Sequence, residues 1–179
     1  WGQHWEIWRL RLPIALYSLA TAALVLLLAR RLSGNLGTGL LAAAVFLAFF
    51  STYRYGRVVL TSAPETFWFF LPFFILLYWR PRAGGLTWIL ALAFGLMVGV
   101  GLLYESFALI IPFCAGLTWW TLHQRGYRFA EWLRAEAPKI TLLGVVALGV
   151  FSLWFWLDPN PQLILQDFVL KENAGKFDP

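Results

Sequence analysis

The chain alternates between long apolar segments and short polar ones. Charged residues, glycine or proline bound each apolar segment, and most approach the roughly 20 residues that cross a bilayer as an α-helix. We therefore predict an all-α, polytopic membrane helix bundle of about six transmembrane helices plus short interfacial helices, in a single transmembrane domain over residues 1–179. The predicted spans are residues 12–32, 38–55, 64–79, 86–103, 106–122 and 140–157, and an outer amphipathic tail follows at 160–175.

Local signals predict how some of these helices begin, bend and pack. Gly95 and Gly99 are four residues apart, a spacing at which a second helix can approach closely. Pro72 lies in the middle of its span and is expected to kink it, and Pro112 is also central in its span. Asn160–Pro161 predicts a helix start, with asparagine as the N-cap and proline as the first helical residue.

Two amphipathic stretches predict helices that lie at the membrane surface. Trp1, Trp5 and Trp8 form one stripe ahead of the first span, which is typical of an interfacial anchor. Between the fifth and sixth spans, Phe129 and Trp132 share a helical face, and charged residues occupy the other side.

The composition supports a membrane protein. Of the 179 residues, 60% are hydrophobic and only 13% are charged, whereas soluble domains contain about 25% charged residues. Aromatic residues make up 18% of the chain, and Trp and Tyr collect at membrane interfaces. Cys114 is the single cysteine, which excludes an intrachain disulfide. Because the sequence starts at Trp1 without a signal peptide and ends abruptly at Pro179, we expect an internal fragment of a longer protein.

Basic residues predict the orientation of the chain. The loops after the first, third and fifth spans hold eight of the 14 basic residues, namely Arg30, Arg31, Arg80, Arg82, Arg125, Arg128, Arg134 and Lys139. The positive-inside rule places these loops in the cytoplasm. Most of the nine acidic residues then lie on the outer face. This asymmetry is explained either by a polar site on that face or simply by solvation of the outer loops. The net charge of +5 is explained by orientation, and because no nucleic-acid-binding motif appears, we expect no nucleic-acid partner.

A polar stretch at residues 53–65 separates two apolar spans and contains the first candidate site residues. Arg54 and Arg57 are three apart and share a helical face if the second span continues. Guanidinium groups suit phosphate oxygens, which predicts a lipid-phosphate or pyrophosphate clamp; the alternative is snorkelling to lipid headgroups. Glu65 stands three residues after Ser62 and fits a capping box, or it has a substrate-binding or metal-binding role.

Two further polar points are candidates. Tyr104 and Glu105 leave almost no loop between two spans, so Glu105 either starts the next helix or faces a cavity and pairs with an outer arginine. The tail carries a polar patch that is a solvated helix end in the simplest interpretation; its residues are Lys171, Glu172, Asn173 and Lys176. No classical metal spacing, P-loop or dinucleotide fingerprint appears, and the cofactor is unknown, with a divalent metal left open.

Four stretches resemble GT-C class membrane glycosyltransferases, nearest to the bacterial protein O-mannosyltransferase-like and lipid A aminoarabinose transferase-like groups. Residues 11–34 resemble their RLPS…LLARRLFG segment, and 55–64 resemble YGR…LTDAP. Residues 103–112 resemble LTKGP…LLLP or its KES variant, and 168–177, FVLKENAGKF, resemble FFxEHxxGRF. The likeness covers nearly the whole chain in the same order. It departs from the family pattern where Asp, Lys and His are common, at Ser62, Tyr104 and Asn173.

The resemblance implies transfer of a sugar from a lipid-linked donor, a polyprenyl phosphate, to a glycan, lipid or protein acceptor. It places this reaction on the outer face of a bacterial inner membrane, with membrane lipid as a further partner. It also implies a catalytic acid in a first outer loop upstream of Trp1, so we expect this chain to bind and position substrate. The residues expected to do so are Arg54, Arg57, Glu65, Tyr104, Glu105, Lys171, Glu172, Asn173 and Lys176. The alternative is a non-enzymatic polytopic module, such as part of a lipid-linked oligosaccharide transporter, which interrupted helices would favour.

Overall fold

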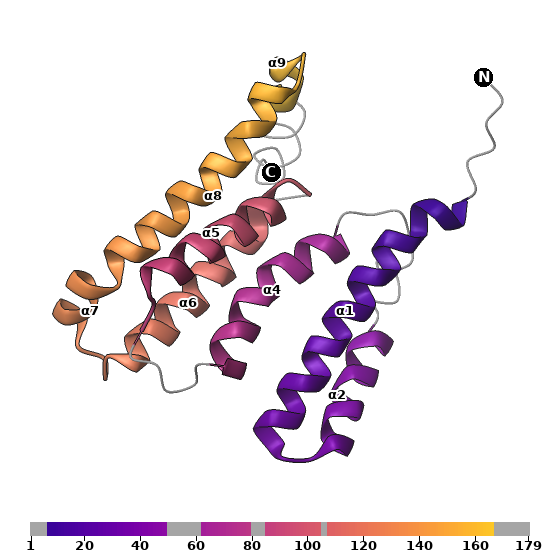
Figure 1. The fold of residues 1–179 in the computed structure, drawn as a ribbon, viewed down its shortest axis with the longest axis vertical. Coiled ribbons are helices and arrows are strands. Elements are labelled where there is room, and N and C mark those ends of the chain that lie inside the picture. The colour runs from indigo at the N-terminus through magenta and orange to yellow at the C-terminus, as the bar shows by residue number, and fades with distance from the viewer. Residues whose placement is uncertain (1–6, 50–61, 80–84, 105–106, 167–179) are drawn as a thin grey trace, which may run out of the picture. The chain divides into compact units, whose positions relative to one another are not determined.

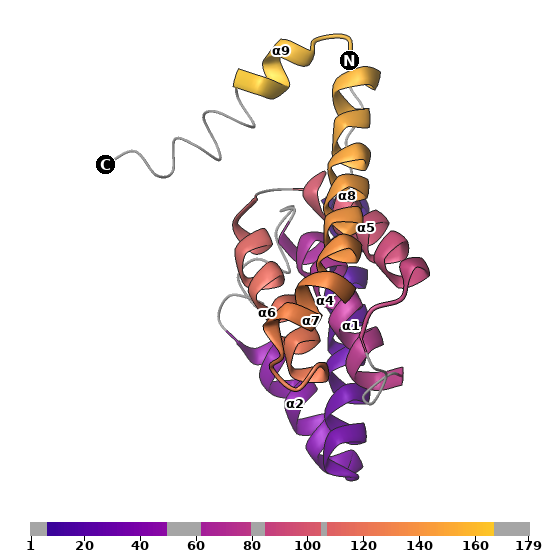
Figure 2. The ribbon, with the colours of Figure 1, turned by 90° about the vertical axis from the view of Figure 1, so that its left-hand side faces the viewer.

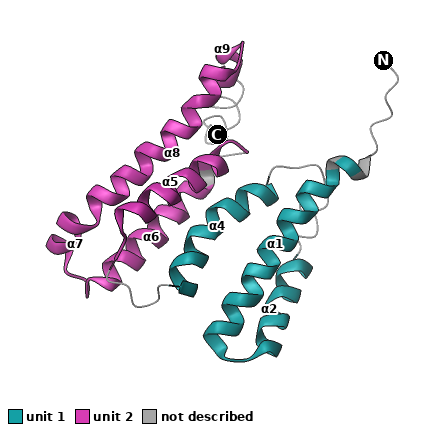
Figure 3. Ribbon diagram, in the orientation of Figure 1, with its two compact units in different colours: residues 1–81 teal, residues 82–179 magenta. Residues whose placement is uncertain are grey.

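The structure, a computed structural model, is all-α over the residues that it describes (Figure 1). These are residues 7–49, 62–79, 85–104 and 107–166. The chain divides into two compact units, residues 1–81 and 82–179 (Figure 3).

The first unit contains three described helices. They are α1 (Ile7–Ser33), α2 (Leu36–Ala48) and α4 (Ser62–Trp79). Both α2 and α4 pack against α1. The described part of α2 ends at Ala48, because Phe49 has an extended backbone (φ −60°, ψ 134°), so the helix stops inside the predicted span 38–55.

A tight turn joins α1 to α2 and holds them as a hairpin. Gly34 has φ +71° and its N–H donates to the carbonyl of Arg30 at 2.8 Å, which is the usual way a helix ends at glycine. Asn35 is the N-cap of α2, and its Oδ1 accepts from the N–H of Gly37 at 2.7 Å. A Cβ on Gly39 would lie 2.7 Å from the Leu26 carbonyl oxygen, so glycine permits the close approach of these two helices.

Helix α4 lies along α1 and buries an aromatic face. Tyr17 of α1 and Phe67 of α4 have ring centroids 5.4 Å apart. Phe69 and Phe74 are buried farther along α4. The helix continues through Pro72 as one element, so the proline does not divide it.

The second unit contains the remaining described helices. They are α5 (Trp88–Leu102), η1 (Phe107–Leu109), α6 (Ile110–Gln124), α7 (Phe129–Ala135), α8 (Ala137–Leu157) and α9 (Pro161–Leu163). Helix α8 runs alongside α5 in both views (Figures 1 and 2). The short helix α7 lies between α6 and α8, where the sequence predicts a short interfacial helix.

The α5–α8 contact confirms the predicted close approach at the two glycines. Cβ atoms on Gly95 and Gly99 would lie 2.7 and 2.6 Å from the Cβ atoms of Val146 and Val150. Separations this short are sterically excluded, so the two helix backbones approach to a distance that only glycine allows.

Two of the described helices are long and apolar enough to cross a membrane, at residues 11–33 and 137–157. Helices α2 and α5 are apolar but shorter. The six-span arrangement therefore stays a prediction.

The structure corrects the place of Pro112. A 3₁₀ turn over residues 107–109 precedes α6, which begins only at Ile110. Pro112 therefore lies in the first turn of the helix rather than at its centre. Helix N–H groups in the first turn have no intrahelical acceptor, so a proline costs little there.

The helix at the start of the tail begins where the sequence predicts, but the predicted capping hydrogen bond is not formed. Helix α9 begins at Pro161 with Asn160 at the N-cap position, and the Asn160 side chain makes no capping hydrogen bond. Instead, Asp158 Oδ1 accepts from the N–H of Asn160 at 2.8 Å. The described tail ends at residue 166.

Candidate functional site

Most of the predicted site residues lie outside the part of the chain that the structure describes. Those residues are Arg54, Arg57, Glu105, Lys171, Glu172, Asn173 and Lys176. Only Glu65 and Tyr104 can be placed, and they belong to different units.

Glu65 is a buried carboxylate in the first turn of α4. Its exposed fraction is 5%, and the helix begins at Ser62. Ser62 is thus already helical, and the residue before it lies outside the described residues. An acid in the first turn interacts favourably with the helix dipole.

Trp68 lies one turn after Glu65, on the same face of α4, and sequence reasoning did not select it. Residues three apart on a helix are neighbours on its surface. Among the described residues, the indole N–H of Trp68 is buried and has no hydrogen-bond acceptor. A buried donor without an acceptor costs about 1–3 kcal/mol. This end of α4 therefore presents a buried carboxylate and an unused donor together.

Tyr104 follows the end of α5 in the second unit. Its backbone N–H donates to the carbonyl of Gly101 at 3.1 Å, in a turn that ends the helix. The side chain is half-buried. Its predicted neighbour, Glu105, is outside the described residues.

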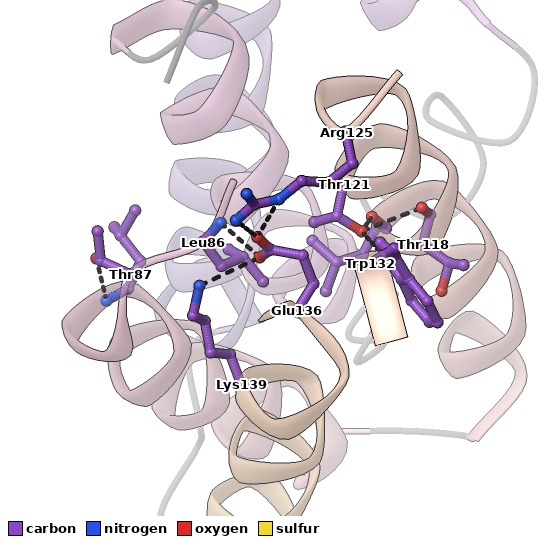
Figure 4. A network of polar contacts seen from close by, with 10 residues as sticks. Leu86, Thr87, Thr118, Thr121, Arg125, Trp132, Glu136 and Lys139 are labelled. Atoms are coloured by element: carbon purple, nitrogen blue, oxygen red, sulfur yellow. Dashed lines mark hydrogen bonds and ion pairs between the residues drawn. The ribbon is translucent and has the colours of Figure 1, made fainter. Parts of the chain in front are cut away.

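The strongest polar cluster among the described residues is centred on Glu136, between α7 and α8 (Figure 4). The side chain is fully buried, with an exposed fraction of 0%. Its Oε2 accepts from the backbone N–H of Leu86 at 2.9 Å. Its Oε1 accepts from Nε of Arg125 at 3.0 Å and also from Nη2 of the same arginine. Lys139 Nζ lies 3.6 Å from Oε2.

These partners come from three parts of the second unit. Leu86 precedes α5, Arg125 caps α6, and Lys139 lies in the first turn of α8. The carboxylate therefore connects the end of α6 and the start of α8 to the start of α5, which lies much earlier in the sequence.

Gly85 makes the burial of this carboxylate possible. Its φ is +114°, a backbone conformation that side chains other than hydrogen rarely adopt. A Cβ at this position would lie 2.7 Å from Cδ of Glu136 and closer still to Oε1. Glycine thus gives both the turn and the space that Glu136 occupies.

A second contact closes the same end of the unit. Trp132 Nε1 donates to Thr121 Oγ1 at 2.9 Å, and Thr121 Oγ1 donates to the carbonyl of Leu117 at 2.8 Å. Thr121 is fully buried. The hydroxyl is therefore satisfied both as donor and as acceptor, and it fastens α7 to α6.

The chemistry of the Glu136 cluster favours a structural role. Two cations and a backbone N–H use the carboxylate oxygens, and the carboxylate has no exposed surface to offer a substrate. Removal of one member of such a buried pair is strongly destabilising. Glu136 is not one of the site residues that the sequence predicted. Pro138 signals that a helix begins here, but it does not signal that the acid before the helix is buried.

Among the described residues, no group of three or more His, Cys, Asp and Glu side chains could hold a metal ion. Glu65, for which the sequence left a metal-binding role open, lies in the described part, whereas the acids Glu105 and Glu172 lie outside it.

The comparisons with known proteins identify one family. The family model described as dolichyl-phosphate-mannose-protein mannosyltransferase matches residues 2–161. No curated protein and no solved structure gives a significant match.

Proposed function

Because the chain belongs to the dolichyl-phosphate-mannose-protein mannosyltransferase family, we propose that it forms part of an enzyme that transfers mannose from a polyprenyl-phosphate carrier to a protein hydroxyl. The match over residues 2–161 carries this proposal. Within the enzyme, this chain binds and positions the donor.

The proposed arrangement is a six-span membrane domain in a bacterial inner membrane. Helices α1 and α8 support it, since each is long and apolar enough to cross the bilayer. The basic loops after the first, third and fifth spans face the cytoplasm under the positive-inside rule. Arg54, Arg57 and Glu65 then lie on the outer face, where the lipid-linked donor is used.

The chemistry proposed for these residues is electrostatic. A general base removes the proton of the acceptor hydroxyl as its oxygen attacks the anomeric carbon of mannose. The bond from that carbon to the lipid phosphate breaks, and the phosphate leaves with the electron pair. The guanidinium groups of Arg54 and Arg57 stabilise the charge that develops on this phosphate, while the buried Glu65 and the Trp68 N–H orient the donor.

The experiment measures mannose transfer from a polyprenyl-phosphate-mannose donor to a serine- or threonine-containing peptide, with the full-length protein in membranes. Arg57→Ala is expected to lower turnover about 100-fold, the usual effect of removing one group that stabilises developing charge. Arg134→Ala removes an exposed arginine from α7 and is expected to leave turnover unchanged. Equal turnover in the two variants would remove Arg57 from the mechanism.

A further inference from the structure

A basic cavity lies at the C-terminal end of α1, within the first unit. Its volume is about 370 Å³, and its walls are formed by Leu27, Arg30, Arg31, Gly34 and Tyr78. Two consecutive arginines come from the last turn of α1, and Tyr78 comes from the last turn of α4. Neither the predicted donor site nor the Glu136 cluster contains any of these residues.

Among the described residues, the two arginines have no carboxylate partner, and Arg31 contacts an aromatic ring. The Arg31 guanidinium carbon lies 5.0 Å from the centre of the Tyr78 ring, a distance typical of a cation–π contact. Over residues 7–49, 62–79, 85–104 and 107–166, neither Arg30 nor Arg31 forms an ion pair with Asp or Glu. Two arginines therefore line the cavity with no carboxylate from the described residues to neutralise them, and the geometry of a guanidinium group matches the oxygens of a phosphate.

An apolar stripe continues from the cavity along α1. Leu27 forms part of the cavity wall and is partly exposed, and Ala23 and Leu16 are exposed farther up the same helix face. Leu16 and Leu27 are separated by 11 helical steps, or about 16 Å along the helix axis, which is close to half of the roughly 30 Å hydrocarbon core. The surface thus has positive charge at one end and, beside it, an apolar stripe about as long as an acyl chain.

We propose that this cavity binds the phosphate headgroup of an anionic phospholipid, with an acyl chain lying along Leu27, Ala23 and Leu16. Basic pockets at the ends of membrane helices are a common setting for such headgroups. A free phosphate ion would use the arginines but would gain nothing from the apolar stripe. Bound lipid would link α1 to α4 through Arg31 and Tyr78, and would therefore stabilise the first unit.

The test measures lipid binding to the purified full-length protein in neutral detergent by native mass spectrometry. Phosphatidylglycerol is compared with phosphatidylcholine, and inorganic phosphate is tested separately through the midpoint of thermal unfolding. The cavity variant is Arg30→Gln with Arg31→Gln. The matched control is Arg9→Gln with Arg11→Gln, which removes two arginines from the opposite end of α1.

The wild-type protein is expected to bind phosphatidylglycerol in preference to phosphatidylcholine and to show no thermal shift with phosphate. An arginine at an anionic surface contributes about fivefold in affinity, so the cavity variant is expected to bind phosphatidylglycerol about 30-fold more weakly. The control variant is expected to stay close to wild type. Equal loss in both variants, or no loss in the cavity variant, would overturn the site.

Two further outcomes decide the remaining cases. A thermal shift with inorganic phosphate that the cavity variant abolishes would show an anion site and overturn the assignment to lipid. If the glutamine variant does not fold, Arg30→Lys with Arg31→Lys replaces it, because that variant keeps both charges. The lysine variant loses the two guanidinium groups, so the proposal expects it to bind lipid more weakly. Unchanged lipid binding in this variant would overturn the proposal.

Discussion

A Cβ atom on Gly95 of α5 would lie 2.7 Å from the Cβ of Val146 of α8. The same substitution would place that Cβ 2.8 Å from the carbonyl oxygen of Leu143. A backbone carbonyl and a branched side chain of α8 thus both lie against this glycine of α5. Because the contact lacks room for a methyl group, the separation of α5 and α8 depends on the glycine.

Gly95→Ala is expected to destabilise the protein. The new methyl group forces α5 and α8 apart, and overpacking of this kind costs about 1–3 kcal/mol. The measurement is the free energy of unfolding in detergent. Gly149→Ala is the matched control, because nothing lies within 4 Å of a Cβ at Gly149. That control is expected to gain about 0.5–1 kcal/mol from the better helix propensity of alanine; a Gly95→Ala protein as stable as the control would contradict the packing argument.

Glu136→Gln is expected to weaken the second unit much more than the same change at an exposed acid. Glutamine leaves Arg125 and Lys139 without their carboxylate, and breaking a buried pair costs about 3 kcal/mol or more. Glu131→Gln is the control, because its pair with Arg128 at 2.7 Å is largely exposed. Exposed pairs contribute about 0.5 kcal/mol. Similar unfolding free energies for the two variants would show that the buried cluster is not stabilising.

Gly85→Ala tests whether the space taken by Glu136 depends on glycine. Gly85 and Gly34 both have positive φ, +114° and +71°, so alanine strains the backbone at either position. Only at Gly85 does the new Cβ also meet Glu136, while the space around Gly34 is open. Gly85→Ala is therefore expected to lower the midpoint of thermal unfolding more than Gly34→Ala does. An equal drop in both would mean that backbone strain is the whole effect.

The spacing of residues predicted which face of a helix makes a close contact, but it did not predict which helix packs against that face. The separation of Gly95 and Gly99 predicted a close helix contact, and the structure confirms it. The partner, α8, begins more than 30 residues later, and no spacing within α5 specifies it. Helix packing in a bilayer depends on matching shapes, which become visible only when both surfaces are known.

Helix ends were harder to predict because apolar residues continue past them. Phe49 leaves the helical conformation although it is as apolar as the residues before it. Before α6, the apolar residues 107–109 form a 3₁₀ turn rather than the start of the α-helix. Composition shows that a segment is apolar, but the backbone hydrogen bonds decide where its helix begins.

The burial of Glu136 could not be predicted from its neighbours in the sequence. Its acceptor role depends on Leu86, fifty residues earlier, and on the positive φ of Gly85. The sequence instead predicted a helix at the membrane surface here, with the charged residues on the side opposite Phe129 and Trp132. Trp68 was missed for a similar reason, because one indole in an aromatic helix shows nothing in the sequence about an unused N–H.

Trp68→Phe separates binding from structure at the start of α4. Phenylalanine keeps an aromatic ring beside Phe67, whose ring centroid lies 5.5 Å from that of Trp68, and removes the N–H that finds no acceptor among the described residues. The free energy of unfolding is expected to stay the same or rise, because a buried unpaired donor is lost.

If this N–H orients the mannose donor as proposed, KM for polyprenyl-phosphate-mannose rises about fivefold, the value of one hydrogen bond of about 1 kcal/mol. The measurement is the dependence of mannose transfer on donor concentration. Phe67→Leu is the control, because it alters the aromatic packing of the same helix without removing a donor. A KM change in Phe67→Leu equal to that in Trp68→Phe would assign the effect to packing, and an unchanged KM in Trp68→Phe would exclude the indole from donor binding.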